Sequence, residues 1–343
     1  MNVKGIIPSL IAALLAILST IPTVQAKDIS LHSDIVWSSP NGFDLTLDIR
    51  TPKLKTESAQ PVLIIFHGGG WVVNRKEIMD DLAEFFTRQA SLVTVNVNYR
   101  LLGDLNNTTT LNEIVEDAMG SVLWIKHNIG KYGGDPHKIV ITGDSAGGHL
   151  AAMVMLHAKR LQSSSISTEK FGFTPTYLIP GQTSESAVAS DSLSVQGVIL
   201  SYPALDIETM AVAGTLETPK GIIWQMAGLP ARGLFGTDVT YKRNAEIYQL
   251  HSPLQWVKNN VYHQLPPQLI TVGELDPLTP PQTATEYVNT LRQSGNRIDY
   301  AVYKDRTHGY LDSGCNAYSN VCFSDIASPA LNDMLNFINN LFD

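Results

Sequence analysis

The stretch Val140-Ile141-Thr142-Gly143-Asp144-Ser145-Ala146-Gly147-Gly148-His149 decides how this chain folds. It begins inside a β-branched apolar run, residues 138–142, which predicts a buried strand. The apolar run 150–158 that follows predicts a helix. Between them lies Gly-x-Ser-x-Gly, and its glycines remove side chains that would clash where a strand turns directly into a helix. We therefore expect Ser145 to stand on a strained, exposed turn with its hydroxyl pointing outward.

The Gly-x-Ser-x-Gly motif is short and common, so other residues must show whether its serine is catalytic. A serine hydroxyl is a weak nucleophile unless a base takes its proton and an acid orients that base. Backbone N–H groups must also stabilise the negative charge that develops on the substrate oxygen. The rest of the sequence supplies a candidate for each of these needs.

The candidate oxyanion donors lie in His-Gly-Gly-Gly-Trp, residues 67–71, directly after the first buried strand. Consecutive glycines let the backbone turn inward with its N–H groups open to a ligand. Losing one such donor typically slows an acyl transfer by about 10²–10³. We assign the amides of Gly69 and Gly70, together with that of Ala146, to the oxyanion hole. Trp71 is expected to line the pocket as a substrate contact.

His308 is the candidate base, because it follows the last predicted strand, and α/β sites lie at the carboxyl ends of strands. His67 is interpreted as a hydrogen-bonding residue that shapes the glycine loop, and His149 as packing locally after the serine turn. His32 precedes the core. The remaining histidines have no motif around them and are interpreted as surface or capping residues, namely His127, His137, His157, His251 and His263.

Asp276 is the candidate acid, in a tight turn after the predicted strand 268–272. An aspartate there can accept the Nδ1–H of His308 and leave Nε2 free for Ser145. The chain order serine, aspartate, histidine is the order of the hydrolase fold that carries this serine turn. The rival acids are Glu274, Asp305 and Asp206, of which Asp305 is interpreted as capping its own loop.

Strand and helix patterns alternate along about 300 residues and predict a mostly parallel, doubly wound α/β sheet with helices on both faces. An antiparallel pair over 34–50 precedes it. The expected buried strands are 61–66, 92–97, 139–142, 197–201, 268–272 and 298–303. The expected helices are 79–89, 111–128, 147–159, 282–294 and 329–341.

Two stretches interrupt this alternation. Residues 162–194 are rich in Ser and Thr with few apolar anchors, and we expect a mobile surface loop. Residues 206–263 are a long excursion with many aromatic and aliphatic side chains. Long insertions in compact folds are often lids, so this excursion is predicted to form a small helical cap over the site.

Five motifs together resemble the α/β-hydrolase serine esterases: residues 67–71, Asn-Tyr-Arg-Leu at 98–101, Tyr-Gly-Gly-Asp-Pro at 132–136, residues 143–149, and the Asp276/His308 pair. Within that fold the chain is similar to the hormone-sensitive-lipase-like branch and to the bacterial feruloyl/acetyl esterase and arylformamidase group. Leu-Gly-Asp at 102–104 departs from the Ala-Pro-Glu of the lipase-like branch and favours the second group.

The resemblance implies a serine carboxylic-ester hydrolase that acts through an acyl-enzyme, and the N-terminal segment predicts that it is exported. Short-chain, carbohydrate-linked or aromatic esters are the expected small-molecule substrates. One alternative is an amidase or arylformamidase with the same triad, and another is a non-catalytic binding protein on this scaffold. No metal or organic cofactor is expected, because the sequence has no grouped set of His, Cys and Asp ligands.

Composition narrows the setting of the protein. The 343 residues are 44% hydrophobic and 16% charged, which suits one globular domain over residues 27–343. A net charge of −8 without basic clusters argues against nucleic-acid binding. Nothing in the pattern indicates an oligomeric state.

The first 26 residues read as a secretory signal peptide, with Lys4, an apolar run over 10–18 and small residues near Ala26. This predicts a periplasmic or secreted protein. An uncleaved anchor is the alternative, and membrane contact is expected only in that case. In an exported chain Cys315 and Cys322 are expected to form a disulfide, whereas a cytosolic chain would keep two free thiols.

Overall fold

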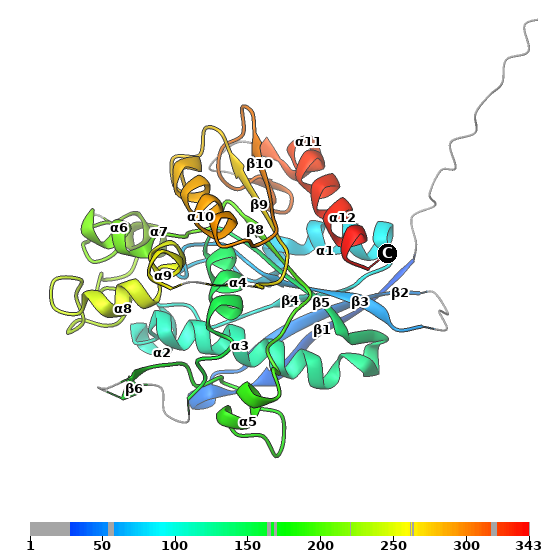
Figure 1. Cartoon of the computed structure of the whole chain (residues 1–343), viewed down its shortest axis with the longest axis horizontal. Coiled ribbons are helices and arrows are strands. Elements are labelled where there is room, and N and C mark those ends of the chain that lie inside the picture. The colour runs from blue at the N-terminus through cyan, green and yellow to red at the C-terminus, as the bar shows by residue number, and fades with distance from the viewer. Residues whose placement is uncertain are drawn as a thin grey trace, which may run out of the picture.

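The computed structural model describes residues 28–53, 58–162, 166–167, 170–219, 221–260, 262, 264–316 and 321–342. The predicted signal peptide lies outside these residues. Within them, one eight-stranded sheet has the order β1-β2-β4-β3-β5-β8-β9-β10 (Figure 1). The strands are β1 (Ile29–Ser38), β2 (Leu45–Pro52), β3 (Gln60–Phe66), β4 (Val93–Val97), β5 (Gly134–Asp144), β8 (Gly197–Ser201), β9 (Gln268–Gly273) and β10 (Ile298–Tyr303).

The sheet is antiparallel at one edge and parallel elsewhere. β2 runs antiparallel to both β1 and β4, while the strands from β4 across to β10 are parallel. A short 3₁₀ turn, η1 (Pro40–Gly42), joins β1 to β2, as the turn signal in the sequence predicts. The predicted mostly parallel, doubly wound sheet is confirmed.

Helices cover both faces of the sheet. The long ones are α1 (Asp80–Ala90), α3 (Leu111–Asn128), α4 (Ala146–His157), α10 (Pro281–Gln293) and α12 (Ser328–Phe342), and each corresponds to a helix that the sequence predicts. Shorter elements are η2 (Lys76–Met79), α2 (Asp104–Asn107), η3 (Ile129–Tyr132), α5 (Ser184–Ala189), α11 (Phe323–Ile326) and the hairpins β6 (Ile166–Ser167) with β7 (Lys170–Phe171) and β11 (Cys315–Asn316) with β12 (Val321–Cys322).

The alternation of side chains along β3 shows how the two faces form. Ile64 and Phe66 belong to a hydrophobic cluster with α3, α4 and α10. Leu63 and Ile65 belong to a second cluster with α1 and α12. Successive side chains of a strand point to opposite faces, so a continuous apolar run fills both layers at once.

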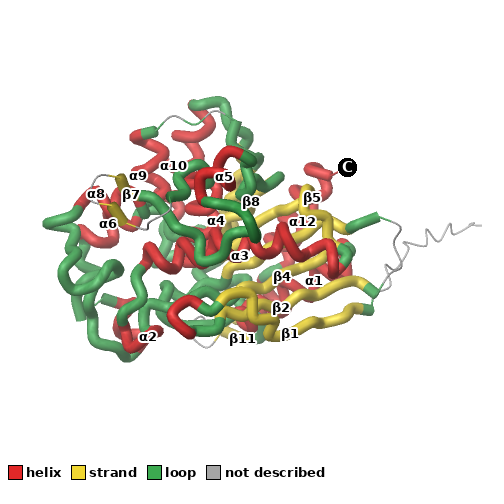
Figure 2. The backbone as a smooth tube through the Cα atoms, turned by 90° about the horizontal axis from the view of Figure 1, so that it is seen from below, coloured by secondary structure: helices red, strands yellow, loops and turns green. Residues whose placement is uncertain are grey.

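The excursion between β8 and β9 folds into four short helices within its described residues. They are α6 (Ile207–Val212), α7 (Ile222–Ala227), α8 (Ala245–Leu250) and α9 (Pro253–Asn259). Figure 2 shows α6, α8 and α9 gathered beyond one end of the yellow strands of the sheet. A methyl group on Gly70 would lie 3.6 Å from Cγ1 of Ile223, so Ile223 of α7 lies beside the glycine loop.

The described part of the Ser/Thr-rich segment is more anchored than its composition suggests. Phe173, Ala187 and Leu193 are buried in the main core. The backbone N–H of Thr174 donates to the Glu116 carboxylate of α3 at 2.9 Å. These contacts hold the segment on the domain, while its mobility stays a prediction.

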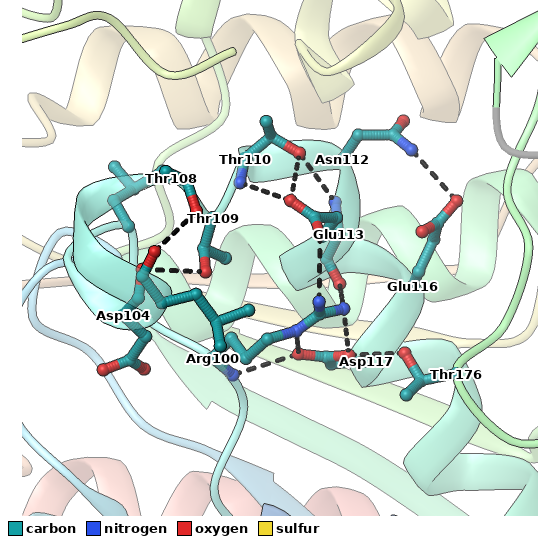
Figure 3. A network of polar contacts seen from close by, with 12 residues as sticks. Arg100, Asp104, Thr108, Thr109, Thr110, Asn112, Glu113, Glu116, Asp117 and Thr176 are labelled. Atoms are coloured by element: carbon teal, nitrogen blue, oxygen red, sulfur yellow. Dashed lines mark hydrogen bonds and ion pairs between the residues drawn. The ribbon is translucent and has the colours of Figure 1, made fainter. Parts of the chain in front are cut away.

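A buried ion pair fastens the loop after β4 to α3. Figure 3 shows the guanidinium of Arg100 forked onto the carboxylate of Asp117, with both N–O distances 2.8 Å. A second ion pair joins Arg100 to Glu113 at 3.0 Å. Paired hydrogen bonds of this kind offset the cost of burying the charges, so the Asn-Tyr-Arg-Leu motif acts as a structural clamp.

Glu116 adds a buried carboxyl group to the same region of α3. Among the described residues, no Lys or Arg forms an ion pair with it. Its Oε1 accepts from the side-chain amide of Asn112 at 3.0 Å and from Thr174. Burial raises the pKa of Glu116 to about 7, and the nearby Asp117 adds to this effect. The protonated form is therefore favoured in the folded protein.

The raised pKa makes stability depend on pH with a definite sign. The contribution of Glu116 is fully present below the ordinary carboxyl pKa and is lost as pH rises through about 7. We expect Glu116→Gln to raise the free energy of unfolding by about 1–3 kcal/mol at about pH 8.5, and by much less at about pH 5. Urea unfolding at both pH values measures this. The exposed control Glu246→Gln should show no such difference, and an equal gain at both pH values would refute the assignment.

Candidate active site

Ser145 stands at a sharp turn between β5 and α4. Its φ of 51° and ψ of −114° are rare for an L-residue with a side chain, so the backbone is strained there. A methyl group on Gly143 would lie 2.3 Å from the backbone of Gly147, and one on Gly147 would lie 2.0 Å from the carbonyl oxygen of Phe66. The glycines on both sides of the serine are therefore required by space, as the sequence predicts.

His308 meets the serine from the loop after β10. Its Nε2 lies 2.9 Å from Oγ of Ser145. The imidazole is largely buried, with 14% of the side chain exposed. With Nδ1 protonated, Nε2 is free to accept the serine proton.

Asp276 holds the other side of the imidazole. Its Oδ2 lies 2.7 Å from Nδ1 of His308, and its Oδ1 accepts the backbone N–H groups of Leu278 and Thr279 at 2.8 and 3.0 Å. Burial would raise the pKa of Asp276, but the hydrogen bonds from His308 and Thr279 outweigh it and lower the pKa below its ordinary value. The carboxyl group therefore stays ionised and can orient His308.

The rival acids lie elsewhere. Glu274 and Asp305 are exposed, and the backbone N–H of Asp305 donates to the Glu274 carboxylate at 3.2 Å. Asp206 caps the start of α6 by accepting the N–H of Thr209 at 3.0 Å. The structure thus brings Asp276, and none of these three, to His308.

The glycine loop lies against the serine turn. A methyl group on Gly68 would lie 2.3 Å from Oδ2 of Asp144, the residue before Ser145. Gly69 and Gly70 have φ values of 114° and 59°, a conformation that glycine adopts without strain. Among the described residues, the N–H groups of Gly69, Gly70 and Ala146 donate to no other part of the chain. No hydrogen bond within these residues therefore competes for the three N–H groups.

His67 shapes this loop from inside. Its Nδ1 lies 2.8 Å from the carbonyl oxygen of Gly68, and its ring stacks on Tyr99 with centres 4.3 Å apart. The Tyr99 hydroxyl donates to the His67 carbonyl at 2.5 Å. Burial lowers the pKa of His67 to about 4, so its ring is neutral. This agrees with its interpretation as a loop-shaping residue.

Trp71, the expected substrate contact, packs inside the domain. The indole is buried, with 1% exposed, and packs edge-to-face on His149 with ring centres 5.2 Å apart. Burying so large a ring gains more free energy than leaving it at an open wall. Trp71 thus supports the loop from within the core, and a contact with substrate stays a prediction.

The structure also places two residues at the site that sequence reasoning missed. Thr279 supports Asp276, and the ring of Tyr202 packs on His308 with centres 4.7 Å apart. The signal for Thr279 was its position three residues after an aspartate in a turn, a pattern in which the carboxylate accepts nearby N–H groups. The signal for Tyr202 was its position directly after β8, at the carboxyl edge of the sheet.

The loop that carries His308 continues into a disulfide. Cys315 and Cys322 are bonded and join the short strands β11 and β12. Just before it, the N–H groups of Ser313 and Gly314 donate to Ile78 and to Asp81, at 2.7 and 2.9 Å. The segment after His308 is thus tied to the start of α1.

The described residues contain no group of three or more His, Cys, Asp or Glu side chains that could hold a metal ion. None of their helices is both long enough and apolar enough to span a membrane.

Comparison with known proteins gives a consistent result. The BD-FAE family matches residues 47–291, well over half of the chain. Esterase LipQ of Mycobacterium tuberculosis is 27% identical over 84% of this chain and 60% of its own length. Carboxylic ester hydrolase LipN of the same organism is 25% identical over 82% of this chain and 65% of its own. The chain thus spans less than two thirds of either relative.

Solved structures support the fold. Thermogutta terrifontis esterase 2, phosphoramylated by tabun, superposes with a TM-score of 0.61 at 20% sequence identity. The match covers 95% of this chain and 100% of that one. The native form of this esterase gives a TM-score of 0.60. The predicted α/β-hydrolase fold is confirmed.

The steric requirement at the serine turn is testable. We expect Gly147→Ala to lower the free energy of unfolding by at least about 2 kcal/mol, because the added methyl would overlap the Phe66 carbonyl. Gly130→Ala is the matched control, since a methyl there meets no atom within 4 Å among the described residues. Gly130→Ala should change the free energy of unfolding by no more than about 0.5 kcal/mol. Equal effects in the two variants would contradict the steric argument.

Proposed function

The chain belongs to the BD-FAE family, and on that premise we propose that it is a serine carboxylesterase that works through an acyl-enzyme on Ser145. One observation carries the proposal: Asp276, His308 and Ser145 form a continuous line of hydrogen bonds, 2.7 and 2.9 Å long. The relatives named as esterases and the confirmed fold add support.

In the proposed acylation, Oγ of Ser145 attacks the ester carbonyl carbon and its proton passes to Nε2 of His308. The carbonyl electron pair moves to oxygen, where the amides of Gly69, Gly70 and Ala146 stabilise it. Asp276 keeps its negative charge and stabilises the imidazolium that forms.

The tetrahedral intermediate then collapses. The bond to the alcohol oxygen breaks, and His308 gives its proton to the leaving alcohol. In deacylation, water attacks the acyl-enzyme while His308 takes a proton from it, and the same proton returns to Ser145 as the acid leaves. The ionised state of Asp276 suits both steps, because it favours the charged form of His308 when that form is needed.

We propose short-chain, carbohydrate-linked or aromatic esters as the substrate class. The position of Ile223 of α7 beside Gly70 supports the view that the excursion between β8 and β9 limits the space next to the glycine loop. The excursion would then act as the cap that selects the substrate.

Export is part of the same proposal. Cleavage after Ala26 would release the domain into an oxidising compartment, and the Cys315–Cys322 disulfide supports this setting. We expect the mature protein to be recovered outside the cytoplasm with an N-terminus at or near Lys27. N-terminal sequencing of fractionated cells measures this, and a full-length chain in the cytosol would contradict it.

Ser145→Ala is expected to lower kcat for p-nitrophenyl acetate by about 10⁴-fold or more, because the covalent step is lost. Folding is checked by thermal unfolding, and Ser190→Ala in an exposed turn is the control that should keep full activity. Unchanged turnover by Ser145→Ala would refute the proposed site.

Turnover of esters of increasing acyl length, acetylated sugars and hydroxycinnamate esters then defines the substrate class. Faster cleavage of a matched anilide would favour an amidase.

A further inference from the structure

We propose that Tyr202 is a positioning residue that holds His308 in line between Asp276 and Ser145. This inference rests on the proposed function, because it deepens the account of the same site. Tyr202 follows β8, the strand that lies between the strands leading to Ser145 and to Asp276.

The backbone around Tyr202 encloses the serine turn. The N–H of Ser145 donates to the carbonyl of Ser201 at 2.9 Å, and the N–H of Ala204 donates to the carbonyl of Ser145 at 3.1 Å. Tyr202 lies between these two bonds with a φ of 36°, a strained conformation for a residue with a side chain. Strain of this kind persists where the surrounding structure holds it, and it concentrates at functional sites.

The ring of Tyr202 limits the movement of the base. It is fully buried and meets the imidazole of His308 edge-to-face, at an interplanar angle of 64°. The ring of Tyr310 also packs edge-to-face on the ring of Tyr202, with ring centres 4.5 Å apart. A ring fixed in this way restricts rotation of the imidazole away from the line joining the acid and the serine.

The main-chain carbonyl of Tyr202 reaches the acid through Thr279. It lies 3.0 Å from the hydroxyl of Thr279. That hydroxyl is also 2.9 Å from Oδ2 of Asp276 and 3.3 Å from Nδ1 of His308. The main chain of Tyr202 therefore helps to set where the acid and the base meet.

The phenol hydroxyl joins the base loop to the serine turn. It accepts the backbone N–H of Leu311, three residues after His308, at 3.3 Å. The buried carboxyl of Asp144, the residue before Ser145, interacts electrostatically with the same phenol. Burial raises the pKa of Tyr202 well above its ordinary value, so the hydroxyl keeps its proton and can donate.

These contacts make Tyr202 a link between the nucleophile, acid and base segments. Its ring touches His308, and the rest of its influence passes through Thr279, Leu311 and Asp144. Small errors in the placement of reacting groups cost about 10²-fold in rate. Loss of the link should therefore act on the chemical step and leave substrate binding unchanged.

Tyr202→Phe and Tyr202→Leu in the full-length protein test this. Tyr202→Phe keeps the ring and removes the hydroxyl, so kcat for p-nitrophenyl acetate should fall about 5- to 20-fold with KM within twofold. Tyr202→Leu also removes the ring and should lower kcat by about a further 10-fold.

Tyr287→Phe is the matched control. It also loses one buried phenol bond, to Gln268 at 3.3 Å, but it lies on α10 away from the site. Its kcat should stay within twofold.

Three results would overturn the proposal: a kcat of Tyr202→Phe within twofold of wild type, a change confined to KM, or an equal loss of kcat in Tyr287→Phe. If thermal unfolding shows that Tyr202→Leu is not folded, Tyr202→Phe alone decides the outcome. Failure of the proposed function is distinguishable, because it would appear as activity retained by Ser145→Ala. An inactive Ser145→Ala together with a fully active Tyr202→Phe would refute the role of Tyr202 alone.

Discussion

The close approach of backbone to backbone at the serine turn is the constraint on which the rest of the site depends. Gly147 lies against the carbonyl of Phe66, at a distance that leaves no room for a Cβ. Because β3 and β5 are neighbours in register, with Phe66 opposite Gly143, the glycine loop and the serine turn leave the sheet side by side. The free N–H groups and the serine hydroxyl therefore come together through the pairing of two strands.

The strand order completes the site. β5, β8, β9 and β10 are consecutive neighbours, and each is followed by one contributor: Ser145, Tyr202, Asp276 and His308. The carboxyl ends of parallel strands form one edge, so residues distant in the chain meet there. Tyr202 occupies the place between the nucleophile and the acid. This explains how one side chain can contact the base while its main chain and its hydroxyl reach the other two segments.

Buried charge supports the loops that carry no secondary structure. Arg100 and Asp117 fix the loop after β4, and Tyr99 in that loop bonds the His67 carbonyl at the start of the glycine loop. The hydrogen bonds of such a pair offset the desolvation cost of burying the two charges. Asp144 differs from Asp117, because within the described part of the chain it has no arginine partner of this kind. Burial raises the pKa of Asp144 well above the ordinary value, and one of its oxygens has no partner among the described residues. The serine turn is thus built around a carboxyl group that favours its protonated form.

The sequence by itself determined the local features whose cause is local. The glycines around Ser145, the apolar runs of β3 and β8 and the placement of Asp276 and His308 after strands follow from steric and periodic rules within a few residues. Only the tertiary structure decided the burial of Trp71, the anchoring of Phe173 and the roles of Thr279 and Tyr202. These depend on partners far along the chain, such as the Thr279 hydroxyl and the Tyr202 carbonyl. No short pattern records such a contact, because it forms only when neighbouring strands bring their ends together.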